Sequence, residues 1–194
     1  MTKIIGLTGG IGSGKTMVAK YIESLGIPVY IADDEAKTIM ETDEVYEAVK
    51  KELGTEVFDN QKLNRKKLAQ LVFTNSEKRD KLNKIVHPLV KKHFDLWVKM
   101  NENAQFVVKE AAILFESGSY KYCDAIITVT SPLETRIQRV MHRDKSDRAS
   151  VLKRIESQWT DEQRIAKSDF VIHNISVDAT YKQIEQILNL LKNK

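Results

Sequence analysis

The stretch Gly9-Gly10-Ile11-Gly12-Ser13-Gly14-Lys15-Thr16 fits G-x-x-x-x-G-K-[ST], the pattern of a phosphate-binding loop. An apolar run, residues 4–8, precedes the motif, and apolar residues recur at helical spacing after it until Gly26 and Pro28 end the pattern. The motif therefore stands between a predicted strand and a predicted helix, as a phosphate-binding loop requires. We predict that this segment, the phosphate loop, binds a nucleoside triphosphate.

The residue types of the phosphate loop explain how it would hold its ligand. Glycines let consecutive backbone N–H groups converge on phosphate oxygens, and the N-terminus of the following helix adds the positive end of its dipole. Lys15 is expected to reach the outer phosphates, and the hydroxyl of Thr16 can ligate Mg²⁺. The predicted nucleotide-binding residues are Gly10, Ile11, Gly12, Ser13, Gly14, Lys15 and Thr16.

A pair of acids follows the second predicted strand. A short apolar run, residues 29–32, ends at Asp33 and Asp34, which makes the first 34 residues a βαβ unit. Because ligands of open α/β sheets bind at the carboxyl edge of the strands, we expect Asp33 to lie across that edge from Lys15. A carboxylate there can accept the proton of an acceptor hydroxyl. The alternative is that Asp33 or Asp34 caps the next helix.

The remainder of the chain separates into a helical stretch and a returning β pattern. Residues 35–103 are charged, almost free of Gly and Pro, and helical in period, with Leu68, Phe73 and Phe94 among the core candidates. Continuous apolar runs typical of buried parallel strands then appear at 106–108, continuing through 111–115, at 125–129 and at 170–172. An amphipathic helix closes the chain.

These patterns predict an α/β fold with one inserted region. Residues 1–34 and 104–194 are expected to form the core with five strands, and residues 35–103 a helical insertion.

Three arginines recur with helical spacing after Pro132, which is expected to open a helix. Arg136, Arg139 and Arg143 lie at i, i+3 and i+7, so one helix face would present three guanidinium groups. Such a face suits a lid over transferring phosphates, at about residues 136–150. The simpler alternative is a solvated basic helix face.

The net charge of +4 is concentrated in one segment. From Arg136 to Arg154 there are seven basic residues and two acids, a local charge of +5, which leaves about −1 elsewhere. Nucleic-acid surfaces usually combine such charge with a recognition motif or interleaved aromatics, and the segment has neither. We therefore expect a small polyanionic ligand and no nucleic acid. A nucleotide-dependent switch or RNA-binding protein is the alternative of another class.

Length and composition indicate a globular protein. The 194 residues are 42% hydrophobic and 30% charged, which suits one continuous fold with a real core. No apolar run approaches the roughly 20 residues that span a bilayer, and the N-terminus lacks the pattern of a secretory leader, so we expect no membrane partner and a cytoplasmic location. The single cysteine, Cys123, excludes an intramolecular disulfide and is predicted to be a small apolar filler.

A second motif must separate the classes of protein that share the phosphate loop, which include GTPases, ATPases and small-molecule kinases. A GTPase would carry N-K-x-D, and the nearest match, residues 83–86, ends in Val86. No separate strand ends in a clear Mg²⁺-holding aspartate, and Glu110 and Glu116 are the candidates for that role. These observations favour a kinase in which Asp33 serves the acceptor.

Taken together, the motifs resemble those of the dephospho-CoA kinase family over essentially the whole chain. The blocks that carry the resemblance are LTGGIGSGKT at 7–16, Ile31-Ala32-Asp33, Leu63-Asn64-Arg65 through Val72-Phe73, Leu82 through His87-Pro88, Leu114-Phe115-Glu116, Arg136 through Arg143-Asp144, Arg154-Ile155 with Gln158, and Asp169 through Ile172 with Asn174. Phosphate loops alone are common, whereas this ordered series is specific.

The resemblance implies a fold and a reaction. The fold would be the three-layer P-loop fold of nucleoside-monophosphate kinases, with a five-stranded parallel sheet, a helical CoA-binding insertion and a short lid. The reaction would transfer the γ-phosphoryl group of ATP to the 3′-hydroxyl of dephospho-CoA in the last step of coenzyme A biosynthesis, with Mg²⁺ present.

The family also implies roles for particular residues of this sequence. Asp33 would be the catalytic base that accepts the hydroxyl proton. Lys15 and Thr16, together with Mg²⁺, would hold the phosphates of ATP. Arg139 and Arg143 would neutralise the charge of the transferring group.

Two further matches and two departures complete the resemblance. Arg65 and His87 match acceptor-side residues and are carried as substrate-binding candidates, although a His-Pro pair can also simply shape a helix junction. Ile31 replaces the first acid of the family's D-A-D, and Ala112 stands where the family has proline. A kinase for another small hydroxyl or nucleoside monophosphate is the nearest alternative, and the sequence does not indicate an oligomeric state.

Overall fold

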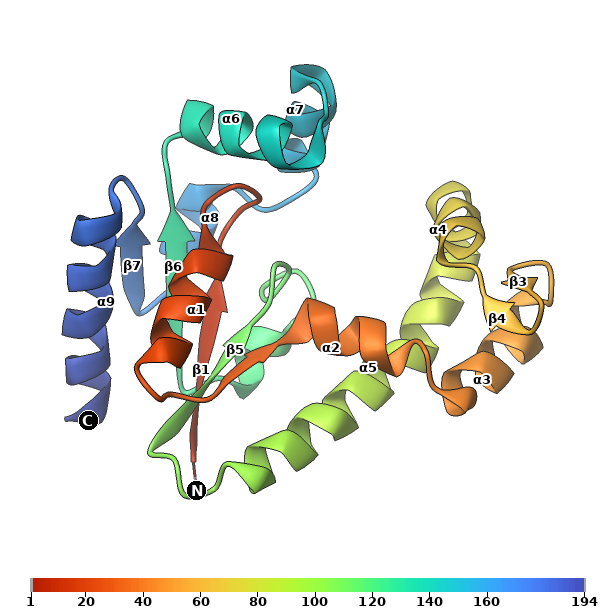
Figure 1. The fold of residues 1–194 in the computed structure, drawn as a ribbon, viewed down its shortest axis with the longest axis horizontal. Helices are drawn as coiled ribbons and strands as arrows, with labels where there is room; N and C mark the ends of the chain where they lie inside the picture. Colours follow the sequence, from red (N-terminus) through yellow and green to blue (C-terminus); the bar gives the residue numbers. More distant parts are fainter. Residues whose placement is uncertain (1, 194) are drawn as a thin grey trace. The chain divides into compact units, whose positions relative to one another are not determined.

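The computed structural model describes residues 2–193 (Figure 1). The chain divides into two compact units, each with its own hydrophobic cluster. The core unit consists of the residues up to Ile31 and those from Asn101 onward, and the helical unit is Ala32–Met100. No helix among the described residues is long and apolar enough to cross a membrane.

Five parallel strands form the sheet of the core unit, in the order β2-β5-β1-β6-β7 (Figure 1). Their bounds are β1 (Lys3–Thr8), β2 (Val29–Ile31), β5 (Phe106–Glu110), β6 (Ala125–Thr130) and β7 (Phe170–His173). The predicted five-stranded parallel sheet is confirmed. Strand β1 is central, and the next strand of the chain, β2, lies on one side of it while β6 and β7 lie on the other. The carboxyl end of β1, where the phosphate loop begins, is therefore the switch point at which such sheets bind ligands.

The helices of the core unit include the three that were predicted, after the phosphate loop, after Pro132 and near the end of the chain, and three shorter ones that were not predicted. They are α1 (Lys15–Ser24), the 3₁₀ helix η1 (Ser119–Tyr122), α6 (Leu133–Asp144), α7 (Arg148–Glu156), α8 (Asp161–Ile165) and α9 (Val177–Lys192). Helices α1 and α9 pack in one cluster with the sheet, and Val18, Ile22, Ile184 and Leu188 are almost completely buried there. This burial holds the start of α1 against the sheet.

The expectation that the strand at 106–108 continues through 111–115 is wrong. Strand β5 ends at Glu110, and the following residues form turns. The Ala111 N–H still donates to the Leu7 carbonyl, which is the last ladder contact. Leu114 is completely buried because it packs beside Gly6, where an added Cβ would lie 2.7 Å from its Cδ2. The apolar run therefore reflects burial of a turn and not a longer strand.

Cys123 packs beside the same glycine and behaves as an apolar filler. An added Cβ at Gly6 would lie 3.0 Å from its Sγ atom. Burial raises the pKa of the Cys123 thiol to about 11, so the thiol is protonated at neutral pH.

The helical unit begins and ends three residues before the predicted stretch 35–103, so Asp33 and Asp34 belong to it and not to the core, and it contains one hairpin that was not predicted. Its elements are α2 (Ala32–Ile39), α3 (Asp43–Leu53), β3 (Phe58–Asp59), β4 (Lys62–Leu63), α4 (Arg65–Thr74) and α5 (Ser76–Met100). Strands β3 and β4 pair antiparallel across Asn60 and Gln61, which both have positive φ, at 47° and 66°. A two-residue turn with two left-handed residues matches the twist of such a hairpin.

The core of the helical unit only partly follows the predicted list. Leu68 and Phe94 are buried as expected. Phe73 is 88% exposed, so its assignment to the core is wrong. It lies near the end of α4, where its side chain points away from the cluster around Val45 and Val49.

Candidate active site

The phosphate loop joins β1 to α1 in a conformation that glycine alone adopts readily. Gly12 has φ of 80°, and Gly14, the N-cap of α1, has φ of 95°. Both values lie in the left-handed region, which is strained for residues with a Cβ. Lys15 is the first residue of α1, so the positive end of the helix dipole points toward the loop. The predicted strand, loop and helix are confirmed.

Lys15 forms a nearly buried ion pair with Glu110. The distance from Nζ to Oε1 is 3.3 Å, and the side chains are only 12% and 7% exposed. Glu110 ends β5, the neighbour of β1, so the pairing of Leu7 with Glu110 in the ladder brings the carboxylate to the loop. Glu110 therefore orients the lysine at the carboxyl edge of the sheet.

Thr16 follows Lys15 and is exposed. Its hydroxyl has no hydrogen bond within residues 2–193 and is free to take a ligand. Mg²⁺ in kinases is usually held by one or two protein oxygens together with substrate phosphates and water. A free hydroxyl on the last residue of the phosphate loop fits that requirement.

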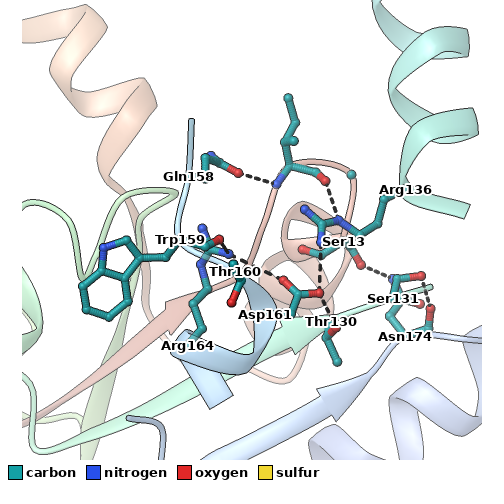
Figure 2. A network of polar contacts seen from close by, with 12 residues as sticks. Ser13, Thr130, Ser131, Arg136, Gln158, Trp159, Thr160, Asp161, Arg164 and Asn174 are labelled. Atoms are coloured by element: carbon teal, nitrogen blue, oxygen red, sulfur yellow. Dashed lines mark hydrogen bonds and ion pairs between the residues drawn. The ribbon is translucent and has the colours of Figure 1, made fainter. Parts of the chain in front are cut away.

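The three arginines of α6 occupy different environments, which the helical spacing did not distinguish. Arg136 is buried, donating through Nε to the Ile11 carbonyl at 2.9 Å and through Nη1 to Asp161 at 3.0 Å (Figure 2). Arg139 also contacts the loop, with Nη1 at 3.4 Å from the carbonyl oxygens of Gly12 and Ser13. The structure therefore brings Arg136 and Arg139 to the phosphate loop.

Arg143 lies near the end of α6 and is held on the surface instead. Its guanidinium donates twice to Asp144, at 2.6 and 3.0 Å, and Arg154 donates to the same carboxylate at 2.6 Å. The Arg143 guanidinium, with a further contribution from Arg154, holds the pKa of the Asp144 carboxyl far below its usual range. Arg143 would have to exchange this carboxylate for a phosphate in order to act on a substrate.

The helical unit carries Asp33 in the first turn of α2. Because the helix begins at Ala32, Asp33 lies inside it and does not act as its cap. The Asp33 side chain is exposed and makes no hydrogen bond or ion pair among the described residues, whereas Asp34 pairs with Lys37 at 2.6 Å. Of the two neighbouring acids, Asp33 is the one whose carboxylate is free to accept a proton.

Arg65 and His87 lie in different settings of the same unit. Arg65 donates to the Lys37 carbonyl at 2.9 Å and to Glu41 at 2.6 Å, so it lies beside the helix that carries Asp33. His87 is exposed in the middle of α5, and the helix continues through Pro88. The His-Pro pair therefore does not mark a helix junction.

The chain matches the family model described as dephospho-CoA kinase over residues 3–179. It belongs to the dephospho-CoA kinase family. The dephospho-CoA kinase of Bacteroides fragilis (strain YCH46) is 42% identical over 191 residues, covering 96% of this chain and 90% of the relative. Membership makes the chain an ATP-dependent kinase with dephospho-CoA as its acceptor.

Solved structures agree with this family and with the P-loop kinase fold. The crystal structure of TT1252 from Thermus thermophilus has a TM-score of 0.88 and 31% identity, with 97% of each chain covered. The dephospho-CoA kinase from Campylobacter jejuni has a TM-score of 0.73 and 26% identity, covering 100% of this chain and 98% of that one.

Two residues of this dephospho-CoA kinase family member contact the phosphate loop although sequence analysis gave them no role. Gln158 accepts the N–H of Ile11 at 2.9 Å. Asn174, which is buried, donates through Nδ2 to the Ser13 carbonyl at 2.8 Å. Both stand in blocks that carry the family resemblance, and this was the only signal available, since their partners lie about 150 positions away in the chain.

Glu116, an alternative Mg²⁺ candidate of the kinase, has a structural role instead. Its carboxylate accepts from Arg164 Nη2 at 3.2 Å and from the Trp159 N–H at 3.1 Å. Arg164 is completely buried, so this carboxylate and that of Asp161 together compensate a charge without access to water.

Proposed function

We propose that Asp33 and the phosphate loop carry the transfer of the γ-phosphoryl group from ATP to the 3′-hydroxyl of dephospho-CoA. In this step the hydroxyl O–H bond breaks and its proton passes to the Asp33 carboxylate. The hydroxyl oxygen forms a bond to the γ-phosphorus as the bond to the β,γ-bridging oxygen breaks, and ADP leaves. The supporting observation is the exposed, unpartnered carboxylate of Asp33, which contrasts with the paired carboxylate of Asp34.

Charge neutralisation would supply most of the rate enhancement. The transferring group is strongly anionic, and fixed donors that meet it need not reorganise during the reaction. The proposed donors are Lys15, Arg139, Arg143 and the N–H groups of the phosphate loop other than those of Ile11 and Ser13, which donate to Gln158 and to the Gly10 carbonyl. Arg139 is supported by its contacts to the loop carbonyls, and Arg143 would act after leaving Asp144.

Mg²⁺ is the proposed metal of the reaction, with Thr16 as its protein ligand beside the ATP phosphates. When bound, it would neutralise phosphate charge. The exposed and unpartnered Thr16 hydroxyl supports this assignment.

The helical stretch, expected at 35–103 and compact at Ala32–Met100, is the proposed binding unit for the acceptor. Arg65 is its main candidate contact, because a guanidinium can pair with the diphosphate of dephospho-CoA. His87 is a second candidate, supported by its exposed position on α5. Residues 136–150 are the proposed lid.

The test measures ADP release from the purified protein with Mg-ATP and a series of acceptors, with product mass determined in parallel. The acceptors are dephospho-CoA, adenosine monophosphate, cytidine monophosphate and shikimate. We expect turnover and a gain of one phosphate with dephospho-CoA only. Equal turnover with another acceptor would contradict the proposed specificity.

The role of Asp33 is tested by Asp33→Asn, with Asp34→Asn as the matched control on the same turn. Asn keeps the size of the side chain but cannot take the proton, so kcat should fall by about 10²-fold or more while the KM for ATP is unchanged. The control should retain nearly full kcat. Similar kcat values for the two variants would remove Asp33 from the role of base.

A further inference from the structure

Ile11 lies near the middle of the phosphate loop. Both of its backbone polar groups, the carbonyl and the N–H, are hydrogen-bonded to the helical hairpin α6–α7 or to the segment that follows it. Its carbonyl accepts from Arg136 Nε at 2.9 Å, and its N–H donates to Gln158 Oε1 at 2.9 Å (Figure 2). Arg136 lies in the first turn of α6, and Gln158 lies two residues beyond the end of α7. Residues at both ends of the helical hairpin α6–α7 therefore contact a single residue of the loop.

The side chain of Ile11 adds an apolar contact to these two hydrogen bonds. It packs against the small cluster formed by Ile137, Val140 and Val151, which are all almost completely buried. These residues come from α6 and α7, so they form the shared core of the two helices. Ile11 is thus a part of the hydrophobic core of the hairpin as well as of the phosphate loop.

The neighbouring glycines allow this close approach. A Cβ added to Gly12 would lie 2.5 Å from the Arg136 carbonyl oxygen, and one added to Gly10 would lie 2.2 Å from Arg136 Nη2. Backbone and side chain of Arg136 therefore occupy the space beside the loop. The loop cannot shift toward α6 without displacing this arginine.

Buried charges fix Arg136 in turn. Its Nη1 pairs with Asp161, which also accepts from the Thr130 hydroxyl at 2.7 Å (Figure 2). The side chains of Arg136 and Asp161 are 7% and 16% exposed, so the pair is held largely away from water. Arg164 and Glu116 continue the network below it. Breaking such a pair would leave a buried charge uncompensated and is therefore costly. The ion pair with Asp161 thus holds the Arg136 side chain in one position.

We propose that Gln158 and Arg136 are positioning residues that fix the shape of the phosphate loop for the triphosphate and couple it to the hairpin α6–α7. They act through the peptide groups of Ile11 and need not touch the nucleotide. The proposal rests on the assignment of residues 9–16 as the ATP loop and is independent of the role of Asp33. Occupation of the loop by ATP is transmitted to the hairpin through Ile11.

Gln158→Met is the sharpest variant, because methionine keeps the length of the side chain and removes the acceptor for the Ile11 N–H. Gln186→Met is the matched control, since Gln186 is exposed on α9 of the same unit, outside the proposed lid. We expect the KM for ATP to rise about tenfold in Gln158→Met, the size expected when a part-buried N–H loses its acceptor. The KM for dephospho-CoA and kcat at saturating ATP should stay within about twofold of the parent protein.

Two outcomes of these kinetics would overturn the proposal. One is a KM for ATP in Gln158→Met that equals the value in Gln186→Met. The other is a rise of both KM values together with a lower melting temperature, which would assign Gln158 a general structural role. If Asp33→Asn failed to lower kcat, the assignment of the base would fall, but the ATP effect of Gln158→Met would still stand.

Trp159 gives an independent reading of the coupling, because it follows Gln158 and stacks on Phe115 with ring centroids 5.3 Å apart. Replacing the other tryptophan by Trp97→Phe leaves Trp159 as the reporter. We expect ATP to change the Trp159 emission in this background, and Gln158→Met to remove the change at ATP concentrations that saturate the variant. An unaltered response in Gln158→Met, or no response in Trp97→Phe, would contradict the coupling.

Discussion

The phosphate loop of the core unit and the acceptor-side candidates of the helical unit are held by different kinds of contact. Lys15 and its partner Glu110 are 12% and 7% exposed, and buried Arg136 and Asn174 hold the loop carbonyls. Arg65 and its partner Glu41 are 50% and 64% exposed. One region is thus shaped by buried contacts, and the other relies on surface ion pairs.

This difference follows from the chemistry that each region must perform. Donors that stabilise a transferring phosphoryl group are effective when they are already oriented, and burial fixes their orientation. Exposed ion pairs contribute only about 0–1 kcal/mol each, so a ligand can replace them at little cost. Substitutions of the buried groups at the phosphate loop should therefore affect the rate strongly, and those of the exposed ion pairs in the helical unit should affect acceptor affinity more modestly.

The largest effect is expected from Lys15→Ala, which removes the cation of the buried ion pair in the core unit. Loss of the cation that meets the outer phosphates should lower kcat/KM for ATP by about 10³-fold. Lys20→Ala is the control, because Lys20 is an exposed lysine on the same helix. Steady-state kinetics measure both, with circular dichroism to verify folding. An unchanged kcat/KM would refute the loop assignment.

A smaller loss is expected from Gly12→Ala, with Gly26→Ala as a closely matched control. Both glycines have φ of 80°, but a Cβ at Gly12 would lie 2.5 Å from the Arg136 carbonyl oxygen, whereas nothing lies within 4 Å at Gly26. Each change costs about 1 kcal/mol for the left-handed backbone. Only Gly12→Ala must also shift the loop.

The kinetic consequence separates the two glycine variants. We expect kcat/KM for ATP to fall by about 10²-fold in Gly12→Ala, because displaced N–H groups no longer converge on the phosphates. Gly26→Ala should lose thermal stability while keeping nearly normal kcat/KM. Equal kinetics would show that the loop tolerates displacement, which would weaken the contrast between the two regions.

The smallest effect is expected from a substitution in the exposed ion pair of Arg65 with Glu41 in the helical unit. Arg65→Ala should raise the KM for dephospho-CoA by about tenfold and leave the KM for ATP unchanged, since a charged hydrogen bond to the acceptor is lost. Lys66→Ala, at the next position of α4, which is also exposed, is the control. If both variants behave as the parent protein does, Arg65 does not bind the acceptor.

The fold could be predicted where the pattern of residues is local. Glycine spacing defined the loop, and continuous apolar runs identified all five strands of the sheet. The hairpin β3–β4 was missed because its strands have only two residues each, too few for a period to appear. The run at 111–115 misled because a buried turn and a buried strand have the same apolar composition.

The site could be predicted only as far as its residues are neighbours in the chain. Helical spacing placed Arg136 and Arg139 on one face of a helix, but it contains no information on which of them becomes buried. The partners of the loop, Glu110, Gln158 and Asn174, reach it through the order of strands and the path of the hairpin. Such long-range pairings are set by topology, which local patterns do not encode.

A lysine that shares its charge with a buried carboxylate discriminates among anions. Any anion that draws the Lys15 ammonium away from Glu110 must replace the attraction between these two charges. This attraction is strong because the pair is nearly buried and water screens it only weakly. A single inorganic phosphate offers little charge for this exchange, whereas a nucleoside triphosphate offers several adjacent charges. We therefore expect the pair to favour occupation of the loop by a triphosphate over occupation by a single phosphate.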